Sequence, residues 1–169
     1  TWKDVTLEED VNLYGVCVAE SGVGHMVGEF GRIFRTEDGG STWAEITSPA
    51  EQTMFCLSRN NDSWFAAGLD GVIMVSFDNG LEWERLETGV TESLYGIQVR
   101  GNEGWAVGDV GTVLTTTDGG RTWTHLEVPV KKRLHWIGTL SLSEGSGKTG
   151  FGAGASGLYV GIQEGKLIW

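Results

Sequence analysis

Three aspartates recur at a fixed spacing and are the first candidates for chemistry. Asp38, Asp78 and Asp118 lie 40 residues apart, and each is followed by Gly two residues later and by Trp five residues later. A carboxylate can serve as a general acid or base, but catalysis needs one special arrangement of groups and not three equal copies. We therefore predict that these aspartates shape turns by accepting backbone N–H hydrogen bonds. The predicted structural residues of the motif are Asp38, Gly40, Trp43, Asp78, Gly80, Trp83, Asp118, Gly120 and Trp123.

A second set of candidates follows a Leu or Met at the start of each repeat. The residues at this position are aromatic or imidazole, namely Tyr14, Phe55, Tyr95 and His135. If they point toward a common axis, they form a ring at one mouth of a channel, where a ligand could bind. Ordinary packing between sheets is the alternative, because aromatic side chains dominate protein cores.

One basic cluster stands out in an acidic chain. Lys131, Lys132 and Arg133 follow Pro129, and Trp136 lies beside them without a Trp counterpart in the other repeats. The cluster is a candidate contact for an anionic surface or partner, and a solvated loop is the alternative.

Motifs for cofactors, metals and nucleophilic catalysis are missing from the sequence. Gly147-Lys148-Thr149 resembles the end of a phosphate-binding loop, but Leu142 stands where that motif needs Gly. Cys17 and Cys56 occupy different repeat positions and form no C-x-x-C pair, so we expect free thiols and no metal site. We predict no cofactor and no enzymatic activity.

The composition limits the partners. The chain has 169 residues, a formal net charge of −11 and no apolar run near the length of a membrane span of about 20 residues. Such a surface repels nucleic acid and anionic membrane, and it suits a protein partner with a basic face. We expect no nucleic-acid binding and no direct membrane insertion.

The elements that position these residues come from an internal repeat. A G-x-x-G turn precedes each Asp motif at Gly28, Gly68 and Gly108, again 40 residues apart, and a fourth copy begins at Gly154. Acids in these turns (Glu29, Asp70 and Asp109) could bind cations, but we expect them to form the turns.

Each repeat reads as four short strands, which is the period of propeller blades. In the first repeat we expect strands at about 14–19, 25–28, 32–36 and 43–47. The sequence predicts one all-β domain over 1–169, a β-propeller of four-stranded antiparallel blades. The repeats cover about 13–53, 54–93, 94–133 and 134–169, and residues 1–6 form a strand that closes the last blade. Closure within one chain, closure between chains by strand exchange in a homo-oligomer, and a fragment of a longer propeller are all open.

The repeats resemble a known family. The motif matches the Asp-box, or bacterial neuraminidase (BNR) repeat, and residues 28–43 (GEFGRIFRTEDGGSTW) and 108–123 (GDVGTVLTTTDGGRTW) resemble photosystem II stability/assembly factor proteins. The resemblance covers about residues 13–169. It implies a propeller, of seven blades in that family, that acts as an assembly chaperone for a membrane protein. Sialidases share only the Asp-boxes with this chain.

We therefore expect a non-enzymatic protein-binding scaffold or assembly factor. A structural or decoration component of a virion or cell surface and a glycan-binding module are the alternatives. The family resemblance favours an extracytoplasmic or secreted location, and a virion-associated one is the alternative.

Overall fold

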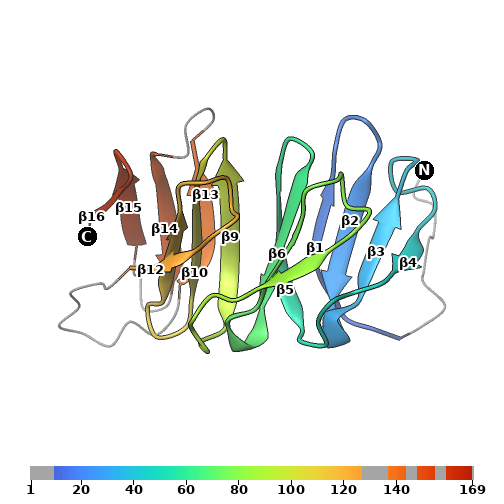
Figure 1. Ribbon diagram of the computed structural model, residues 1–169, viewed down its shortest axis with the longest axis horizontal. Coiled ribbons are helices and arrows are strands. Elements are labelled where there is room, and N and C mark those ends of the chain that lie inside the picture. Colours follow the sequence, from blue (N-terminus) through green and yellow to red (C-terminus); the bar gives the residue numbers. More distant parts are fainter. Residues whose placement is uncertain (1–9, 127–136, 144–147, 155–158, 169) are drawn as a thin grey trace.

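The computed structural model describes residues 10–126, 137–143, 148–154 and 159–168. Its strands form four antiparallel sheets of four strands each, and strands that are consecutive in the sequence are neighbours within each sheet. The sheets stand side by side in sequence order, with the first and fourth at opposite ends of the row (Figure 1). The predicted propeller architecture of four-stranded antiparallel blades is confirmed.

The first two sheets contain β1 (Leu13–Val18), β2 (Gly24–Gly28), β3 (Ile33–Thr36), β4 (Ala44–Ile46), β5 (Met54–Asn60), β6 (Ser63–Gly68), β7 (Ile73–Ser76) and β8 (Glu84–Leu86). The last two contain β9 (Leu94–Arg100), β10 (Glu103–Gly108), β11 (Val113–Thr116), β12 (Thr124–His125), β13 (Ile137–Leu142), β14 (Gly150–Gly154), β15 (Tyr159–Gln163) and β16 (Lys166–Ile168). The four strands of the first sheet match the expected ranges to within one residue at each end.

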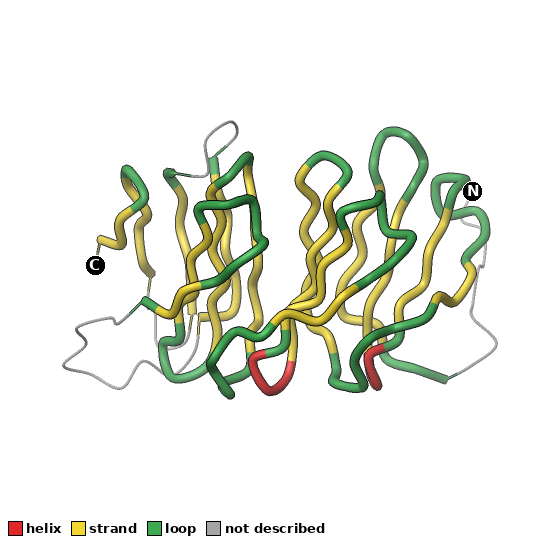
Figure 2. Tube along the Cα trace, in the orientation of Figure 1, coloured by secondary structure: helices red, strands yellow, loops and turns green. Residues whose placement is uncertain are grey.

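The first three G-x-x-G segments form the tight turns between the second and third strands of their sheets. The first two are single 3₁₀ turns, η1 (Glu29–Gly31) and η2 (Leu69–Gly71), and both lie at the same edge of the series of sheets (Figure 2). Gly31 has φ +69°, and a Cβ atom there would lie 1.9 Å from the carbonyl oxygen of Ala50. Glycine is needed at this position because the turn packs directly against the chain leading to the next sheet.

The core consists of apolar layers between consecutive sheets. Each sheet has a forward face, toward the next sheet, and a backward face, toward the preceding one. Between the second and third sheets, the forward face contributes Phe65 and Ile73, and the backward face contributes Leu94 and Ile97. Equivalent clusters lie between the first and second sheets and between the third and fourth. Stacking therefore buries faces that one sheet alone would leave in water.

The fourth sheet departs from the others at its outer hairpin. A short turn at Glu164 and Gly165 joins β15 to β16, where the first three sheets have the Asp motif. The fourth sheet reaches four strands with β16 as its outer strand. The predicted pairing of residues 1–6 with this sheet lies outside the described residues.

Candidate binding site on the inner strands

The repeated aspartates are saturated by hydrogen bonds within their own turns. Asp118 accepts bonds from the backbone N–H groups of Arg121 and Thr122, both at 3.0 Å, and from the hydroxyls of Thr116 and Thr122 at 2.7 and 2.6 Å. The Thr116 hydroxyl oxygen also accepts the N–H of Gly120 at 3.0 Å. Bonds from the Thr122 hydroxyl and backbone N–H, followed by that of Thr116, lower the pKa of Asp118 to about 2.

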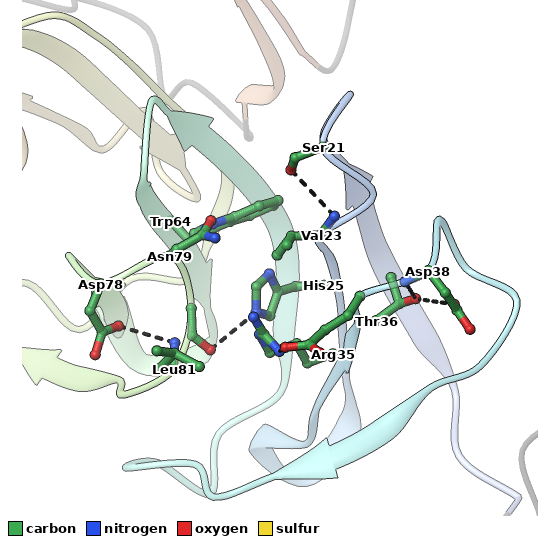
Figure 3. Close-up of polar contacts among 12 residues, drawn as sticks. Ser21, Val23, His25, Arg35, Thr36, Asp38, Trp64, Asp78, Asn79 and Leu81 are labelled. Atoms are coloured by element: carbon green, nitrogen blue, oxygen red, sulfur yellow. Dashed lines mark hydrogen bonds and ion pairs between the residues drawn. The ribbon is translucent and has the colours of Figure 1, made fainter.

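The same arrangement holds Asp38, whose pKa is also lowered to about 2, chiefly by the backbone N–H and hydroxyl of Thr42. Asp78 bonds the backbone N–H of Leu81 at 3.0 Å, as Figure 3 shows. A carboxylate that is ionised at neutral pH and already holds several donors is poorly suited to proton transfer. The geometry favours turn formation by these aspartates.

Three aromatic side chains of the inner strands lie next to one another. The ring centroids of Tyr14 and Phe55 are 5.5 Å apart, and those of Phe55 and Tyr95 are 5.2 Å apart. We call Tyr14, Phe55 and Tyr95 the aromatic row. Each belongs to a different sheet, so the row runs across three sheets at the same level of the inner strands.

A β-bulge produces each member of the row. Pairing of β1 with β2 passes from Leu13 to Gly15 and omits Tyr14, and pairing of β5 with β6 omits Phe55 in the same way. Tyr95 is omitted where β9 pairs with β10. A bulge frees a side chain from the alternation of the ladder and re-aims it.

In the fourth sheet the bulged residue is Gly138, between Ile137 and Thr139. Gly138 therefore occupies the bulged position in β13. His135, the fourth candidate from the sequence, lies outside the described residues. A hollow of about 400 Å³ is lined by the aromatic row and Gly138.

Carboxylates from the G-x-x-G turns flank two of the three rings. The Tyr95 hydroxyl donates to Asp109 Oδ2 at 2.9 Å. The pKa of Glu29 is lowered chiefly by hydrogen bonds from the side chain and backbone N–H of Asn12, with a smaller contribution from Tyr14. Burial, followed by the bond to Asp109, raises the pKa of Tyr95. At Phe55, which has no hydroxyl, the matching turn residue is Leu69. Comparing the first variable residue of each G-x-x-G turn with the aromatic position could have revealed this pairing from the sequence.

In the first three turns, the second variable residue is exposed and has a strained backbone conformation. Phe30, Asp70 and Val110 have φ values of 56°, 57° and 55°, in the left-handed region. Asp70 thus belongs with Phe30 and Val110 and not with the row-flanking acids Glu29 and Asp109. Such a conformation is least favourable for a β-branched residue such as Val110.

A second hollow of about 380 Å³ lies farther along the inner strands. Its lining includes both cysteines, Arg59 and Arg100. The cysteines are unpaired, as expected from the sequence. Burial raises the pKa of Cys56 to about 12 and that of Cys17 above its ordinary value. Thiols held in the protonated form are weak nucleophiles.

The other candidates fall outside the described residues. These are Lys131, Lys132, Arg133 and Trp136, together with His135. Within the described ranges, no group of three metal-ligating side chains comes together. No helix in the described part of the chain has the length and apolar character needed to cross a membrane.

Comparison with known proteins gives one family. The family described as Photosynthesis system II assembly factor YCF48 matches residues 1–96 and 60–139. No curated protein matches the chain.

Solved structures share the fold. A structure of YCF48 bound to D1 peptide is 20% identical, with a TM-score of 0.74 over 96% of this chain and 54% of that chain. YCF48 from Cyanidioschyzon merolae is 20% identical, with a TM-score of 0.73 over 98% of this chain and 57% of that chain. The GH74 enzyme of Niastella koreensis is 15% identical, with a TM-score of 0.72 over 97% of this chain and 30% of that chain. The chain thus spans little more than half the length of the YCF48 structures.

Proposed function

The chain belongs to the Photosynthesis system II assembly factor YCF48 family, and from this we propose that it is a non-enzymatic scaffold that binds a polypeptide segment on the aromatic row. The observation that carries the proposal is the series of four bulges. They aim three rings and one glycine into a single hollow of about 400 Å³.

The hollow suggests the chemistry of the segment. Rings that stand about 5 Å apart offer apolar faces to an aliphatic or aromatic side chain. The absence of a side chain at Gly138 leaves room at the end of the row. Glu29 and Asp109 place negative charge beside the rings, in a chain whose net charge is −11. The best fit is a segment with an apolar residue next to Lys or Arg.

The geometry of the Asp motifs is more consistent with a scaffold than with an enzyme. Their carboxylates are equal in three sheets and are occupied by turn hydrogen bonds. The likeness to a GH74 enzyme concerns the fold, and one fold supports many unrelated functions.

A displayed library of random peptides tests the proposal. Peptides selected on the wild-type chain should lose about fivefold to thirtyfold in affinity on Tyr14→Ala, because an aromatic contact contributes roughly 1–2 kcal/mol. Gly138→Tyr should weaken binding as strongly by filling the hollow. Gly138 is not among the glycines with positive φ, so this change does not strain the backbone.

Leu81→Ala is the control, because Leu81 is exposed and lies in an Asp motif away from the row. Selected peptides that bind Tyr14→Ala, Gly138→Tyr and Leu81→Ala equally well would refute the proposal, as would a library that yields no binder. Circular dichroism on each variant checks that the sheets are intact.

A narrower proposal concerns the source of the segment. Family membership and the YCF48 structure with a bound D1 peptide support a photosystem II subunit as the partner. A labelled D1 peptide titrated against the chain should bind more tightly than a scrambled version, and Gly138→Tyr should abolish the difference. If library peptides need the row but the D1 peptide does not bind, the scaffold stands and the photosystem partner is rejected.

A further inference from the structure

The tips of the first three G-x-x-G turns present apolar side chains to solvent. Each tip consists of the two variable residues of the turn, and each contains one acidic and one apolar residue. We call these three pairs the turn tips: Glu29-Phe30, Leu69-Asp70 and Asp109-Val110. The apolar members Phe30, Leu69 and Val110 are 71%, 36% and 69% exposed.

The backbone of the turn gives no reason for an apolar residue at the second position of a tip. Phe30, Asp70 and Val110 share the same left-handed conformation, with φ values of 56°, 57° and 55°. Asn, Asp and Gly adopt this conformation readily, whereas an aromatic or β-branched residue is strained in it. Phe30 and Val110 also gain nothing from burial, because both are exposed. A strained backbone that keeps an apolar side chain in solvent indicates a contact with a partner.

Backbone hydrogen bonds hold each tip beside the aromatic row. In the third sheet the N–H of Asp109 donates to the carbonyl of Ser93 at 2.9 Å, and Ser93 lies two residues before Tyr95. The equivalent bonds in the first two sheets run from Glu29 to Asn12 at 3.0 Å and from Leu69 to Thr53 at 2.9 Å. The turn tips therefore border the row along the same edge of the sheets, in positions that the backbone fixes.

We propose that the turn tips and the aromatic row form one binding edge, crossed by an extended polypeptide that is apolar at Phe30, basic at Asp70 and apolar at Val110. This inference rests on the proposed function, because the row binds the same segment. The order of contacts follows from the exposed second positions, which are apolar, acidic and apolar from the first sheet to the third. A basic residue opposite Asp70 also complements a chain whose net charge is −11.

The spacing of packed sheets sets the spacing of the contacts along the bound segment. Packed sheets lie about 10 Å apart and an extended chain advances about 3.3 Å per residue, so successive tips meet residues about three positions apart. The expected pattern is an apolar residue, then Lys or Arg about three positions later, then a second apolar residue about three positions after that. A segment of about seven residues therefore reaches from the first tip to the third.

Peptides selected from the displayed library on the wild-type chain test this inference, and their sequences should be enriched in the expected pattern. Phe30→Asn and Val110→Asn remove the apolar side chains, and each should weaken binding at least about fivefold. Because Asn tolerates the left-handed backbone, the denaturant midpoint of each variant should equal or exceed that of the wild type. A loss of binding without a loss of stability separates contact with the peptide from damage to the fold.

Asp70→Asn tests the charge, because it keeps the shape of the tip. The wild-type chain should prefer Lys or Arg over Ala at the middle position of the peptide by about threefold, and on Asp70→Asn this preference should disappear. Leu81→Asn is the matched control for the apolar variants and should bind like the wild type. Leu81 is 61% exposed, but it lies between β7 and β8, at the opposite end of β7 from the turn tip.

The outcomes separate this inference from the proposed function. Peptides that lose affinity on Tyr14→Ala but bind Phe30→Asn and Val110→Asn as tightly as the wild type would overturn the inference and leave the proposed function standing. Peptides that need the tips but not Tyr14 would reject the row as the site, and with it the single binding edge. Selected sequences without the pattern, or a preference for Lys or Arg that persists on Asp70→Asn, would overturn the order of contacts.

Discussion

Acidification should destabilise the protein through one buried histidine. His25 is fully buried between the first two sheets, and its Nε2–H donates to the carbonyl of Gly80 at 3.2 Å, as Figure 3 shows. Among the described residues its Nδ1 has no hydrogen-bond partner. The rings of Trp64 and Trp83 lie in T-shaped arrangements with the His25 ring, with centroids at 4.4 and 5.5 Å. Burial is the main cause that lowers the pKa of His25 from 6.5 to about 4.

The sign and size of the effect follow from these two pKa values. Because the folded pKa is lowered, the unfolded chain takes up the proton first, so stability is complete above pH 6.5 and falls as the pH drops toward 4. Between about pH 7.5 and 4.5 the loss in the free energy of unfolding is about 2.5 kcal/mol. The lowered pKa values of Asp38 and Asp118 add little in this window, because their contribution is lost only below the ordinary aspartate value of 3.8.

His25→Phe isolates this contribution. Phe65 of β6 occupies the position that His25 has in β2, and its phenyl ring is buried between the second and third sheets. The His25 site can therefore hold a phenyl ring. Guanidinium unfolding at both pH values should show a loss that is larger by about 2.5 kcal/mol for the wild type than for His25→Phe. The variant keeps the smaller loss from carboxylates such as Glu29 and Glu45, whose lowered pKa values also act near pH 4.5. His125→Gln on the exposed strand β12 is the control and should keep the wild-type loss. A His25→Phe variant that loses as much stability as the wild type would refute the assignment.

Two further predictions concern the Asp motif and the thiols. Gly120→Ala should lower the free energy of unfolding by about 3 kcal/mol or more, because Gly120 has a positive φ and a Cβ atom there would clash with the buried Phe65 ring. Gly119 has a positive φ but no such clash, so Gly119→Ala should lower the free energy of unfolding by only about 1–2 kcal/mol. Equal losses in denaturant titrations would contradict the packing argument. Cys56 should react more slowly with iodoacetamide at pH 8 than Cys17, because burial raises its pKa to about 12, and mass mapping of the modified residues that found the reverse order would contradict this.

The parts of the structure that the sequence predicted are those that depend on neighbouring residues. The Asp-motif turn closes through bonds between residues two to four positions apart, such as those from Thr116 and Thr122 to Asp118. The turn can therefore be recognised in the sequence from Gly, Asp and Trp at fixed spacings. The strands are then predicted in the segments between the turns. The predicted family resemblance is likewise confirmed by the match to the YCF48 family.

The parts that the sequence missed depend on register between strands and on contacts between sheets. Nothing in the local sequence indicates that Gly138 occupies the position in the fourth sheet that Tyr95 occupies in the third. This equivalence follows from how β13 pairs with β14. The burial of His25 was also missed, because its environment comes from Gly80 and Trp83 in the next sheet.

The residue type at the bulged position differs between the four sheets, whereas the residue before it is always large and apolar. This contrast supports a role in recognition. The residue before each bulge is always a large apolar one (Leu13, Met54, Leu94 or Ile137), and three of the four, all but Leu13, are fully buried in a layer between sheets. The bulged residue itself is Tyr, Phe, Tyr or Gly, and the turn residue beside it changes with it from an acid to Leu69. Because a bulge removes the residue from the ladder, the sheet places few demands on its side chain. If the row served only to pack the sheets together, each repeat would need a similar side chain at this position, and Gly138 would leave a void that lowers stability. A glycine at one end of a line of rings is better explained by a ligand that occupies the hollow, and the gain or loss of peptide binding in Gly138→Tyr decides between the two explanations.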